Sequence, residues 1–137
     1  ELVEFVRAAS NSEEEFQQAV QDLHQALDIA AEKVSQSTPA EKSLVGQVDA
    51  LIDTLYFTYG SFVLMGVDPE RIFEIVHQAN MGKIFPDGKA HFDPVTHKIL
   101  KPDNWKEKYA PEPAIKKEIE RQIKAYERHK ERENRMS

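Results

Sequence analysis

The chain contains no cysteine, which removes several kinds of chemistry. Disulfide bridges, thiolate metal sites and cysteine nucleophiles are all excluded. A protein without cysteine suits a reducing compartment, so we expect a cytoplasmic location. Glycine is also scarce, with five residues in 137, and the Asn-Gly pairs that favour tight hairpins are absent. This scarcity of turn residues argues against a sandwich of short strands and favours helices.

Long apolar segments are missing as well. No stretch approaches the roughly 18 apolar residues that a membrane-spanning helix needs. Residues 1–7 have neither the basic start nor the long apolar core of a signal peptide, so we expect no membrane partner. The length of 137 residues, with 40% hydrophobic and 31% charged residues, fits a modest core under a heavily charged surface. The sequence thus predicts a single all-α domain over residues 1–137, a bundle of about four helices.

Charge is unevenly distributed along the chain. The net charge of −6 argues against a nucleic-acid polymer as partner. Residues 114–137 hold 8 Lys and Arg against 5 Asp and Glu, a net charge of +3, and residues 1–113 carry a net charge of −9. The acidic part suits cations, and the basic segment suits steering an anion or pairing with a neighbouring subunit.

Two helices of the N-terminal half are indicated by capping patterns. Ser12 followed by Glu15 matches a capping box, and the helix that it opens should end near Val34. The next helix should span residues 39–65, with Gly66 as the glycine that ends it. Its start carries a capping threonine, a proline at the first helical position and a glutamate that completes the box: Thr38, Pro39 and Glu41.

Two further helices follow. Asp68 as cap and Pro69 in the first turn open a helix that should end near Met81. A highly charged helix should cover residues 114–133. The stretch between them, residues 83–113, loses helical periodicity and holds five of the seven prolines and one glycine. We predict a long irregular loop there, and loops of this length in compact domains are more often functional than idle.

Apolar spacing predicts which helix faces are buried. The expected buried face of residues 39–65 consists of Val45, Val48, Ile52, Leu55, Tyr59, Phe62 and Val63. The helix that ends near Met81 should bury Ile72, Phe73, Ile75, Val76 and Ala79. The last helix has one narrow seam, suited to packing on a neighbour or a partner subunit: Ile115, Ile119, Ile123 and Tyr126. We therefore expect self-association, as a homodimer or homotetramer, to complete the core.

The helix of residues 39–65 carries two carboxylates on one stripe. Asp49 and Asp53 are four residues apart and therefore lie on the same side of a helix. A bound divalent cation is one explanation, because hard cations take oxygen ligands. Two solvated acids at the edge of the buried face are the other. Gly46 and Gly60 share this stripe, which indicates close approach by a ligand or by another helix.

Three segments form a recognisable combination. The first is Asp49-Ala-Leu-Ile-Asp53-Thr-Leu-Tyr-Phe-Thr-Tyr-Gly60, an acidic helix. The second is Gly66-Val-Asp-Pro69 followed by Val76-His-Gln-Ala-Asn80-Met-Gly-Lys83, and the third is Asp93 with Lys98-Ile-Leu-Lys101-Pro102 and Trp105. Together they resemble the all-α nucleoside triphosphate pyrophosphohydrolases, the MazG-like and phosphoribosyl-ATP pyrophosphohydrolase-like superfamily. The resemblance covers about residues 16–111, and the segment from Asn80 to Lys83 is its most specific part.

This resemblance implies a helical bundle completed by oligomerisation. It also implies Mg²⁺-dependent hydrolysis of a nucleotide substrate between its α and β phosphates, which releases pyrophosphate. In the superfamily, the first acidic helix carries Glu-Glu-x-x-Glu and the next carries Glu-x-x-Asp, and these carboxylates hold the metal. The metal, when bound, polarises the α-phosphate and lowers the pKa of a water molecule.

The chain departs from the first acidic pattern. One register places His24, Gln25 and Asp28 at the three acidic positions. Another register places Asp28, Ile29 and Glu32 there. Helical phase favours the first register, because His24 and Asp28 flank the apolar stripe. Neither register restores the full set of carboxylates.

The second acidic pattern is also incomplete, since Gly46 stands where many relatives have Glu, three residues before Asp49. The metal ligands that the resemblance implies are Asp28, Glu32, Asp49 and Asp53. Two hypotheses follow from this set. The chain is either a magnesium-dependent pyrophosphohydrolase, or a non-catalytic relative that kept the helical fold for nucleotide binding or dimerisation.

The resemblance also implies roles for residues outside the acidic helices. Lys83 and Lys101 would act in catalysis by neutralising phosphate charge in the transition state. Asn80 would position sugar or phosphate through its amide, and Trp105 or Tyr56 would stack on the base. The substrate-binding set is therefore Asn80, Lys83, Lys101 and Trp105.

Overall fold

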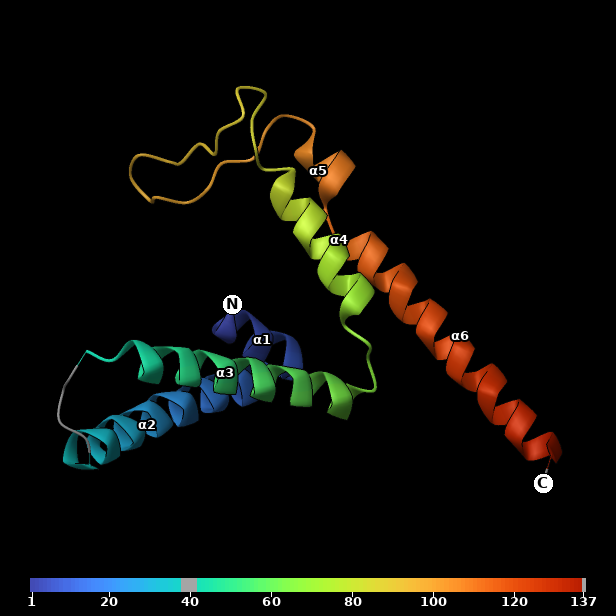
Figure 1. Ribbon diagram of the computed structural model, residues 1–137, viewed down its shortest axis with the longest axis horizontal. Coiled ribbons are helices and arrows are strands. Elements are labelled where there is room, and N and C mark those ends of the chain that lie inside the picture. The colour runs from blue at the N-terminus through green and yellow to red at the C-terminus, as the bar shows by residue number, and fades with distance from the viewer. Residues whose placement is uncertain (38–41, 137) are drawn as a thin grey trace. The chain divides into compact units, whose positions relative to one another are not determined.

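The computed structural model describes residues 1–37 and 42–136, and confirms the all-α class (Figure 1). Six helices are present in these ranges: α1 (Leu2–Ala9), α2 (Glu13–Ser37), α3 (Leu44–Met65), α4 (Glu70–Met81), α5 (Trp105–Tyr109) and α6 (Glu112–Met136). The four predicted helices correspond to α2, α3, α4 and α6, while α1 and α5 are short additional elements. The chain divides into two compact units, 1–48 and 49–137, which we describe separately. The single domain over 1–137 stays a prediction.

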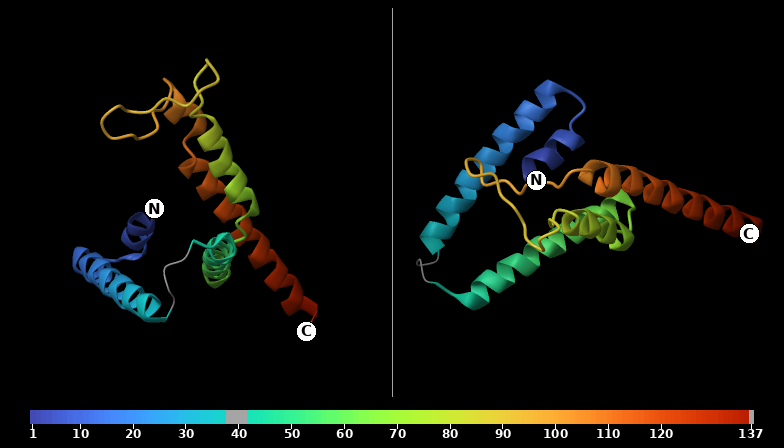
Figure 2. Two further views of the ribbon diagram at one scale, coloured as in Figure 1. Left: turned by 60° about the vertical axis from the view of Figure 1, so that its left-hand side comes forward. Right: turned by 90° about the horizontal axis from the view of Figure 1, so that it is seen from above.

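The first unit contains α1 and α2, which pack against each other (Figure 2). The predicted cap at Ser12 is confirmed, because its Oγ accepts the backbone N–H of Glu15 at 3.1 Å. The Glu15 carboxylate in turn accepts the N–H of Asn11 at 2.7 Å. The guanidinium of Arg7 lies 4.9 Å from the centre of the Phe16 ring, which fastens α1 to the first turn of α2.

The predicted start of the helix over residues 39–65 is wrong by several residues. Lys42 and Ser43 precede α3 rather than belonging to it, and Ser43 caps the helix: its Oγ accepts the N–H of Gly46 at 3.2 Å. Serine is a favoured capping residue because its hydroxyl can accept a free backbone N–H in the first turn. The capping pattern at Ser43 therefore competes with the predicted pattern that begins at Thr38. That earlier signal, Thr38, Pro39 and Glu41, lies outside the described residues. Helix α2 extends to Ser37, beyond the predicted Val34.

The second unit begins within α3 and turns at Gly66 into α4. Gly66 adopts a φ of 67°, and the N–H of Val67 donates to the carbonyl of Phe62 at 3.0 Å. This left-handed residue confirms the predicted helix-ending glycine. The Oδ1 of Asp68 accepts the N–H of Glu70 at 3.1 Å, which is the predicted capping bond. Pro69, however, stands directly before α4 rather than inside it, because the helix begins at Glu70.

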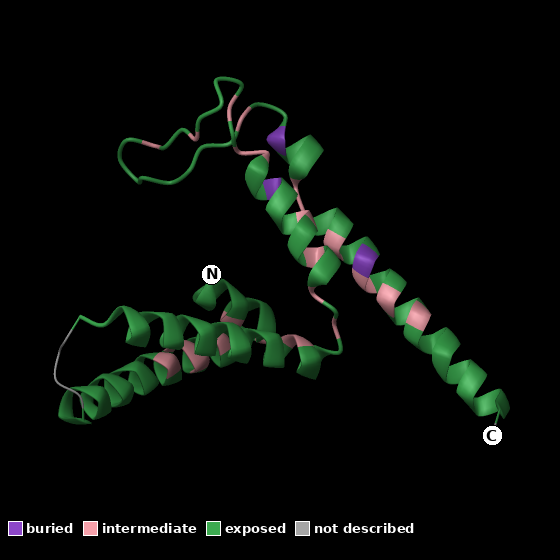
Figure 3. Cartoon of the chain, viewed as in Figure 1, coloured by how far each residue is buried: buried purple, intermediate pink, exposed green. Residues whose placement is uncertain are grey.

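Helices α4 and α6 lie side by side (Figures 1 and 2). Ala79 is buried, and Ile72 and Ile75 are half-buried (Figure 3). Phe73, which we expected in the core, is 73% exposed, and Val76 is also exposed. Residues 72, 75 and 79 follow the three-and-four spacing of one narrow face. Phe73 and Val76 fall on the next column, which α6 does not cover.

The narrow seam of α6 is only partly confirmed. Ile115 and Ile119 are half-buried on the side where α6 meets α4, but Ile123 and Tyr126 are 53% and 67% exposed. Glu118, Gln122 and Ala125 occupy the covered positions instead. At 100° per residue, the covered face is rotated toward Glu118 and Ala125 and away from Ile123, so the contact with α4 rather than the apolar spacing decides which residues are buried.

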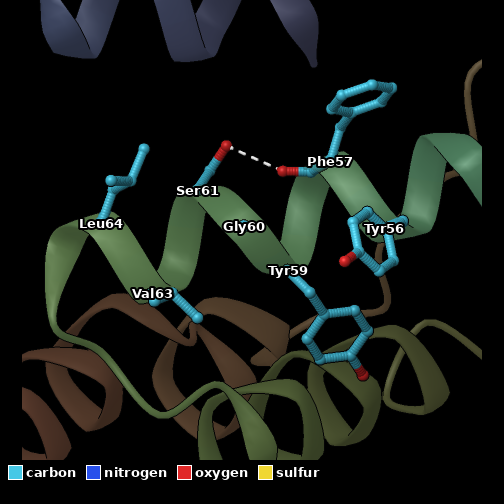
Figure 4. Close-up of a pocket in the computed structure, with 7 residues that line it drawn as sticks. All are labelled: Tyr56, Phe57, Tyr59, Gly60, Ser61, Val63 and Leu64. Carbon is cyan, nitrogen blue, oxygen red and sulfur yellow. Dashed lines mark hydrogen bonds between the residues drawn. The ribbon is translucent and has the colours of Figure 1, made fainter.

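The predicted buried face of α3 is largely exposed among the described residues. Only Phe62 is half-buried, while the other six members of that face are 50–80% exposed. An open hollow of about 640 Å³ is lined entirely by residues of α3: Tyr56, Phe57, Tyr59, Gly60, Ser61, Val63 and Leu64 (Figure 4). Within the second unit, the part of α3 from Asp49 to Met65 therefore carries a large apolar surface that the rest of that unit leaves uncovered.

The predicted loop of residues 83–113 is irregular apart from α5 and from its last two residues, which belong to α6. Its tip is joined by one antiparallel bridge between Phe92 and Ile99. The carboxylate of Asp93 holds the turn inside this bridge, accepting the N–H groups of Val95 and Thr96 at 2.9 and 2.6 Å. These bonds lower the pKa of Asp93. Local hydrogen bonds thus give the loop a defined shape.

Among the described helices, none alone is long and apolar enough to cross a membrane. The bent pair α3 and α4, which turns by 120° at the break between them, meets that test of length and composition only when the two are taken together.

Candidate functional site

The four predicted metal ligands form two pairs, each one helical turn apart. Asp28 and Glu32 lie on α2 in the first unit, and Asp49 and Asp53 lie on α3 in the second. All four are exposed. Among the described residues, none forms an ion pair or hydrogen bond with Asp28, Asp49 or Asp53, whereas Glu32 accepts the side-chain amide of Gln36 at 3.1 Å. Each pair therefore offers carboxylate oxygens that no described cation neutralises.

This donor set is chemically suited to magnesium, because Mg²⁺ prefers oxygen ligands and keeps several of its waters. Within the described ranges, no three His, Asp or Glu side chains gather as a metal-binding group. The two pairs belong to separately described units, so their assignment as metal ligands stays a prediction. The first-helix register that includes His24 stays open for the same reason.

The two glycines on the stripe of Asp49 and Asp53 have open surroundings. A Cβ added at Gly60 would meet nothing within 4 Å, and one added at Gly46 would meet only the side chain of Ser43, at 3.6 Å. Within its own unit, neither glycine is therefore crowded by another element. The two explanations, close approach by a ligand or by another helix, both stay predictions.

The predicted substrate-binding residues come together at the C-terminal end of α4. The ammonium of Lys83 donates to Oδ1 of Asn80 at 2.8 Å. The ammonium of Lys101 lies 4.1 Å from the centre of the Trp105 ring, and that of Lys83 lies 5.9 Å from the same ring. We call these four residues the lysine cluster. Two positive charges from separate segments thus lie near one indole, whose electron-rich faces attract cations.

The indole is a fixed support for the cluster. Trp105 is 8% exposed, and its Nε1–H donates to the backbone carbonyl of Ala79 at 2.8 Å. Burial and the ammonium of Lys101 leave little of the ring available for stacking on a base. Tyr56, the other aromatic suggested for stacking, lies on α3 and is 78% exposed. Trp105 is therefore better placed to hold the two lysine side chains than to stack on a base.

Turn chemistry before α5 brings Trp105 into place. Asn104 has a φ of 66°, a left-handed conformation that asparagine tolerates better than most residues. The N–H of Trp105 donates to the carbonyl of Pro102 at 3.1 Å, and the N–H of Lys108 donates to that of Asn104 at 3.1 Å. Sequence reasoning missed α5, although the turn residues from Pro102 to Asn104 were a usable signal.

An open hollow of about 610 Å³ adjoins the lysine cluster. Its volume falls within the range of small-molecule sites, roughly 300–1,000 Å³. The lining residues are Lys101, Pro102, Asn104, Trp105, Lys106, Glu107, Ala110 and Glu112. A phosphate-bearing ligand next to Lys101 therefore has space for the rest of its body.

A second polar network, which sequence reasoning also missed, ties α6 to the start of α4. Glu118 is 7% exposed and accepts two hydrogen bonds from Arg121, at 2.8 and 2.6 Å, and one from Gln122 at 3.1 Å. Arg121 and Gln122 lower the pKa of Glu118 to about 2. The Gln122 amide also binds both the N–H and the carbonyl of Asp68, each at 2.9 Å. The turn before α4 is thereby clamped at two backbone atoms.

Comparison with known proteins agrees with this all-α arrangement. Residues 1–80, more than half of the chain, match the phosphoribosyl-ATP pyrophosphohydrolase family. Among solved structures, the chain is similar to a protein of Exiguobacterium sp. 255-15 that carries the provisional name NTP pyrophosphohydrolase. The two are 43% identical, and the match covers 90% of this chain and 73% of the other, with a TM-score of 0.78. A comparison with the curated proteins finds no match.

The fold and the match over the two acidic helices define the class as all-α pyrophosphohydrolases of the MazG-like superfamily. Within it, the chain belongs to the phosphoribosyl-ATP pyrophosphohydrolase family. The resemblance found from the sequence is thereby confirmed.

Proposed function

We propose that this protein is a Mg²⁺-dependent nucleoside triphosphate pyrophosphohydrolase, which cleaves between the α and β phosphates and releases pyrophosphate. The lysine cluster is the observation that carries this proposal. Its two ammonium groups lie near one indole, one of them bonded to the Asn80 amide, and Lys101 and Trp105 line an open hollow, in a chain that belongs to a pyrophosphohydrolase family. Positive charges placed in this way favour a group whose negative charge grows during the reaction.

Each member of the lysine cluster has a proposed task. Lys83 and Lys101 bind the phosphate oxygens and stabilise the charge that develops on the leaving pyrophosphate. Asn80 orients Lys83 through the bond between Oδ1 and the ammonium, and its remaining amide N–H groups are donors for phosphate or sugar. Trp105 holds Lys101 against the ring and so fixes where positive charge is presented.

The acidic pairs are the proposed metal ligands. Asp28, Glu32, Asp49 and Asp53 would hold Mg²⁺ together with phosphate oxygens of the substrate. When bound, the metal supplies positive charge to the triphosphate and makes a nearby water more acidic. The exposed carboxylates leave the nucleotide free to complete the ion's ligands.

We also propose that the protein works as a homodimer or homotetramer. The apolar face of α3 supports this, because six residues of that face are at least 50% exposed among the described residues. Burying such a face against a second copy would remove apolar surface from water, at roughly 25 cal/mol per Å². A monomeric mass by light scattering at micromolar concentration would contradict this part of the proposal.

The catalytic proposal is tested by product analysis with a panel of nucleoside triphosphates. In the presence of Mg²⁺ we expect equal amounts of nucleoside monophosphate and pyrophosphate, measured by anion-exchange chromatography. Chelation with EDTA should abolish turnover, and added Mg²⁺ should restore it. Release of inorganic phosphate and nucleoside diphosphate instead would show cleavage at a different bond.

The alternative function is a non-catalytic nucleotide-binding or dimerisation module. Gly46 favours it, because the resemblance places a metal-binding Glu at that position in many relatives. Nucleotide binding and product formation, measured together, distinguish the two functions. The module should bind nucleotide, seen as a rise in melting temperature, without forming any product, whereas the enzyme should do both.

A further inference from the structure

The short helix α5 holds the end of α4 at two points. The first is the hydrogen bond from the indole of Trp105 to the carbonyl of Ala79, at 2.8 Å. The second is the ring of Tyr109, one helical turn later, which lies directly over Gly82. A Cβ added at Gly82 would lie 2.5, 2.6 and 2.9 Å from three carbons of that ring. Contacts this short are not tolerated, so any side chain at position 82 must displace the tyrosine.

Gly82 is thus required for space rather than for backbone freedom. Its φ of −63° and ψ of −10° are ordinary helical values that any residue adopts. The absence of a side chain lets the aromatic ring approach the backbone of α4. A substitution to alanine would leave the preferred backbone conformation unchanged and would act through the contact with Tyr109 alone.

The bond to Ala79 satisfies a carbonyl of the last helical turn, where carbonyls lack partners along the helix. The N–H of Lys83, four residues after Ala79, donates instead to the carbonyl of Asn80 at 3.0 Å. The indole therefore acts as a cap for α4 in place of the usual backbone groups. Helix α5, whose ribbon lies at the C-terminal end of α4 (Figure 1), carries both the capping indole and the ring over Gly82.

These two contacts lie next to Asn80 and Lys83, the two members of the lysine cluster at the end of α4. Asn80 lies between Ala79 and Gly82, and Lys83 follows directly. Trp105 also carries Lys101 on its face. A movement of α5 away from α4 would therefore separate the two ammonium groups that share the indole.

We propose that Tyr109 is a positioning residue for the phosphate-binding lysines. Through its contact with Gly82 it keeps α5 on the last turn of α4, so that Lys83 and Lys101 stay on a common indole. This inference rests on the proposed function of the lysine cluster. Positioning of this kind matters because a misplacement of about 1 Å can reduce a rate about a hundredfold.

A double-mutant cycle tests the contact on which the proposal depends. The variants are Gly82→Ala, Tyr109→Ala and the double variant, with Tyr109→Phe as the matched control that keeps the ring. We expect Gly82→Ala and Tyr109→Ala each to lower kcat/KM for a nucleoside triphosphate about tenfold, mainly through kcat. In the Tyr109→Ala background, Gly82→Ala should change kcat/KM less than about twofold, because no ring is left to displace. Tyr109→Phe should match the wild type.

Tryptophan fluorescence gives a readout that does not depend on turnover. The chain has a single tryptophan, Trp105, so its emission reports the lysine cluster alone. Gly82→Ala should shift the emission to longer wavelength and increase quenching by acrylamide, while Tyr109→Phe should leave both unchanged. Circular dichroism at 222 nm checks that each variant is folded. Should Gly82→Ala fail to fold, Tyr109→Ala carries the test.

Binding of inorganic pyrophosphate, followed through the same emission, separates this inference from the proposed function. The dissociation constant for pyrophosphate should rise about fivefold or more in Gly82→Ala, and stay at the wild-type value in Tyr109→Phe. Additive effects in the cycle, or unchanged emission and affinity in Gly82→Ala, would overturn the positioning role. A wild-type chain that binds pyrophosphate with this dependence but hydrolyses no nucleotide would overturn the proposed function and leave the positioning role supported.

Discussion

The acidic pairs and the lysine cluster differ in how the chain holds them. The lysine cluster is assembled by contacts between neighbouring elements of one unit: α4, the following loop and α5. The carboxylates of Asp28, Asp49 and Asp53 are exposed and lack described partners. Cations that repel each other need a rigid support, which Trp105 provides. Carboxylates meant for a metal are better left without protein cations, because a partner would compete with the ion.

We expect the largest effect from substitutions in the acidic pair on α3. Replacing Asp49 or Asp53 with Asn keeps the size of the side chain and removes a charge. We expect each variant to lower kcat/KM for Mg²⁺-dependent hydrolysis about a thousandfold, since a metal ion supplies several kcal/mol of transition-state stabilisation. Asp22→Asn on α2 is the control and should retain wild-type activity. Equal activity of all three variants would remove the acidic pair on α3 from the site.

Substitutions in the lysine cluster should give the next largest effect. Lys83→Ala and Lys101→Ala should each lower kcat about a hundredfold, the usual cost of removing one group that stabilises developing charge. Lys98→Ala, which lies in the same loop, should be close to the wild type. Steady-state kinetics with a nucleoside triphosphate measures all three. If the two cluster variants raised KM and left kcat unchanged, the lysines would serve binding rather than the transition state.

The contact between α6 and the start of α4 should show a smaller effect, on stability. Gln122→Ala removes two hydrogen bonds to the backbone of Asp68 and one to Glu118. We expect a loss of about 2 kcal/mol in the free energy of unfolding, measured with urea. Gln18→Ala on α2 removes only an exposed side-chain bond and should cost less than about 0.5 kcal/mol. A smaller loss for Gln122→Ala than for Gln18→Ala would show that α6 does not hold this turn.

The smallest effect concerns pH. The pKa of Glu118 is lowered in the folded chain from 4.5 to about 2, chiefly by its hydrogen bonds from Arg121. A lowered folded-state pKa stabilises the fold above pH 4.5, and this contribution is lost as the pH falls from 4.5 to about 2. Thermal melts of Glu118→Gln should therefore be less sensitive to pH in that window than those of the wild type. Parallel curves for the two proteins would contradict the role of this carboxyl group.

The helices and several of their ends could be predicted because their signals are local. The cap at Ser12 and the left-handed Gly66 depend on a few adjacent residues, and both were confirmed. The predicted start of α3 was wrong because two capping patterns stand close together in the sequence. The choice between them depends on contacts outside the helix. Helix α5 was missed because five residues are too few to show periodicity.

Burial was harder to predict than helix position. The apolar spacing of α3 identifies one face, but it does not say whether that face meets the same chain or another copy. Apolar spacing placed Phe73 on a core face and Ile123 on a packing seam, whereas coverage depends on the angle at which helices cross. The lysine cluster was foreseen only through the family resemblance. Its assembly depends on the bond between Trp105 and Ala79, which no spacing in the sequence indicates.

The most direct test of the central claim is hydrolysis in water enriched in ¹⁸O, with the products identified by mass spectrometry. Water that attacks the α-phosphorus should leave one ¹⁸O atom in the nucleoside monophosphate and none in the pyrophosphate, and only when Mg²⁺ is present. Label in the pyrophosphate, or turnover that is independent of the divalent ion, would contradict the proposed reaction.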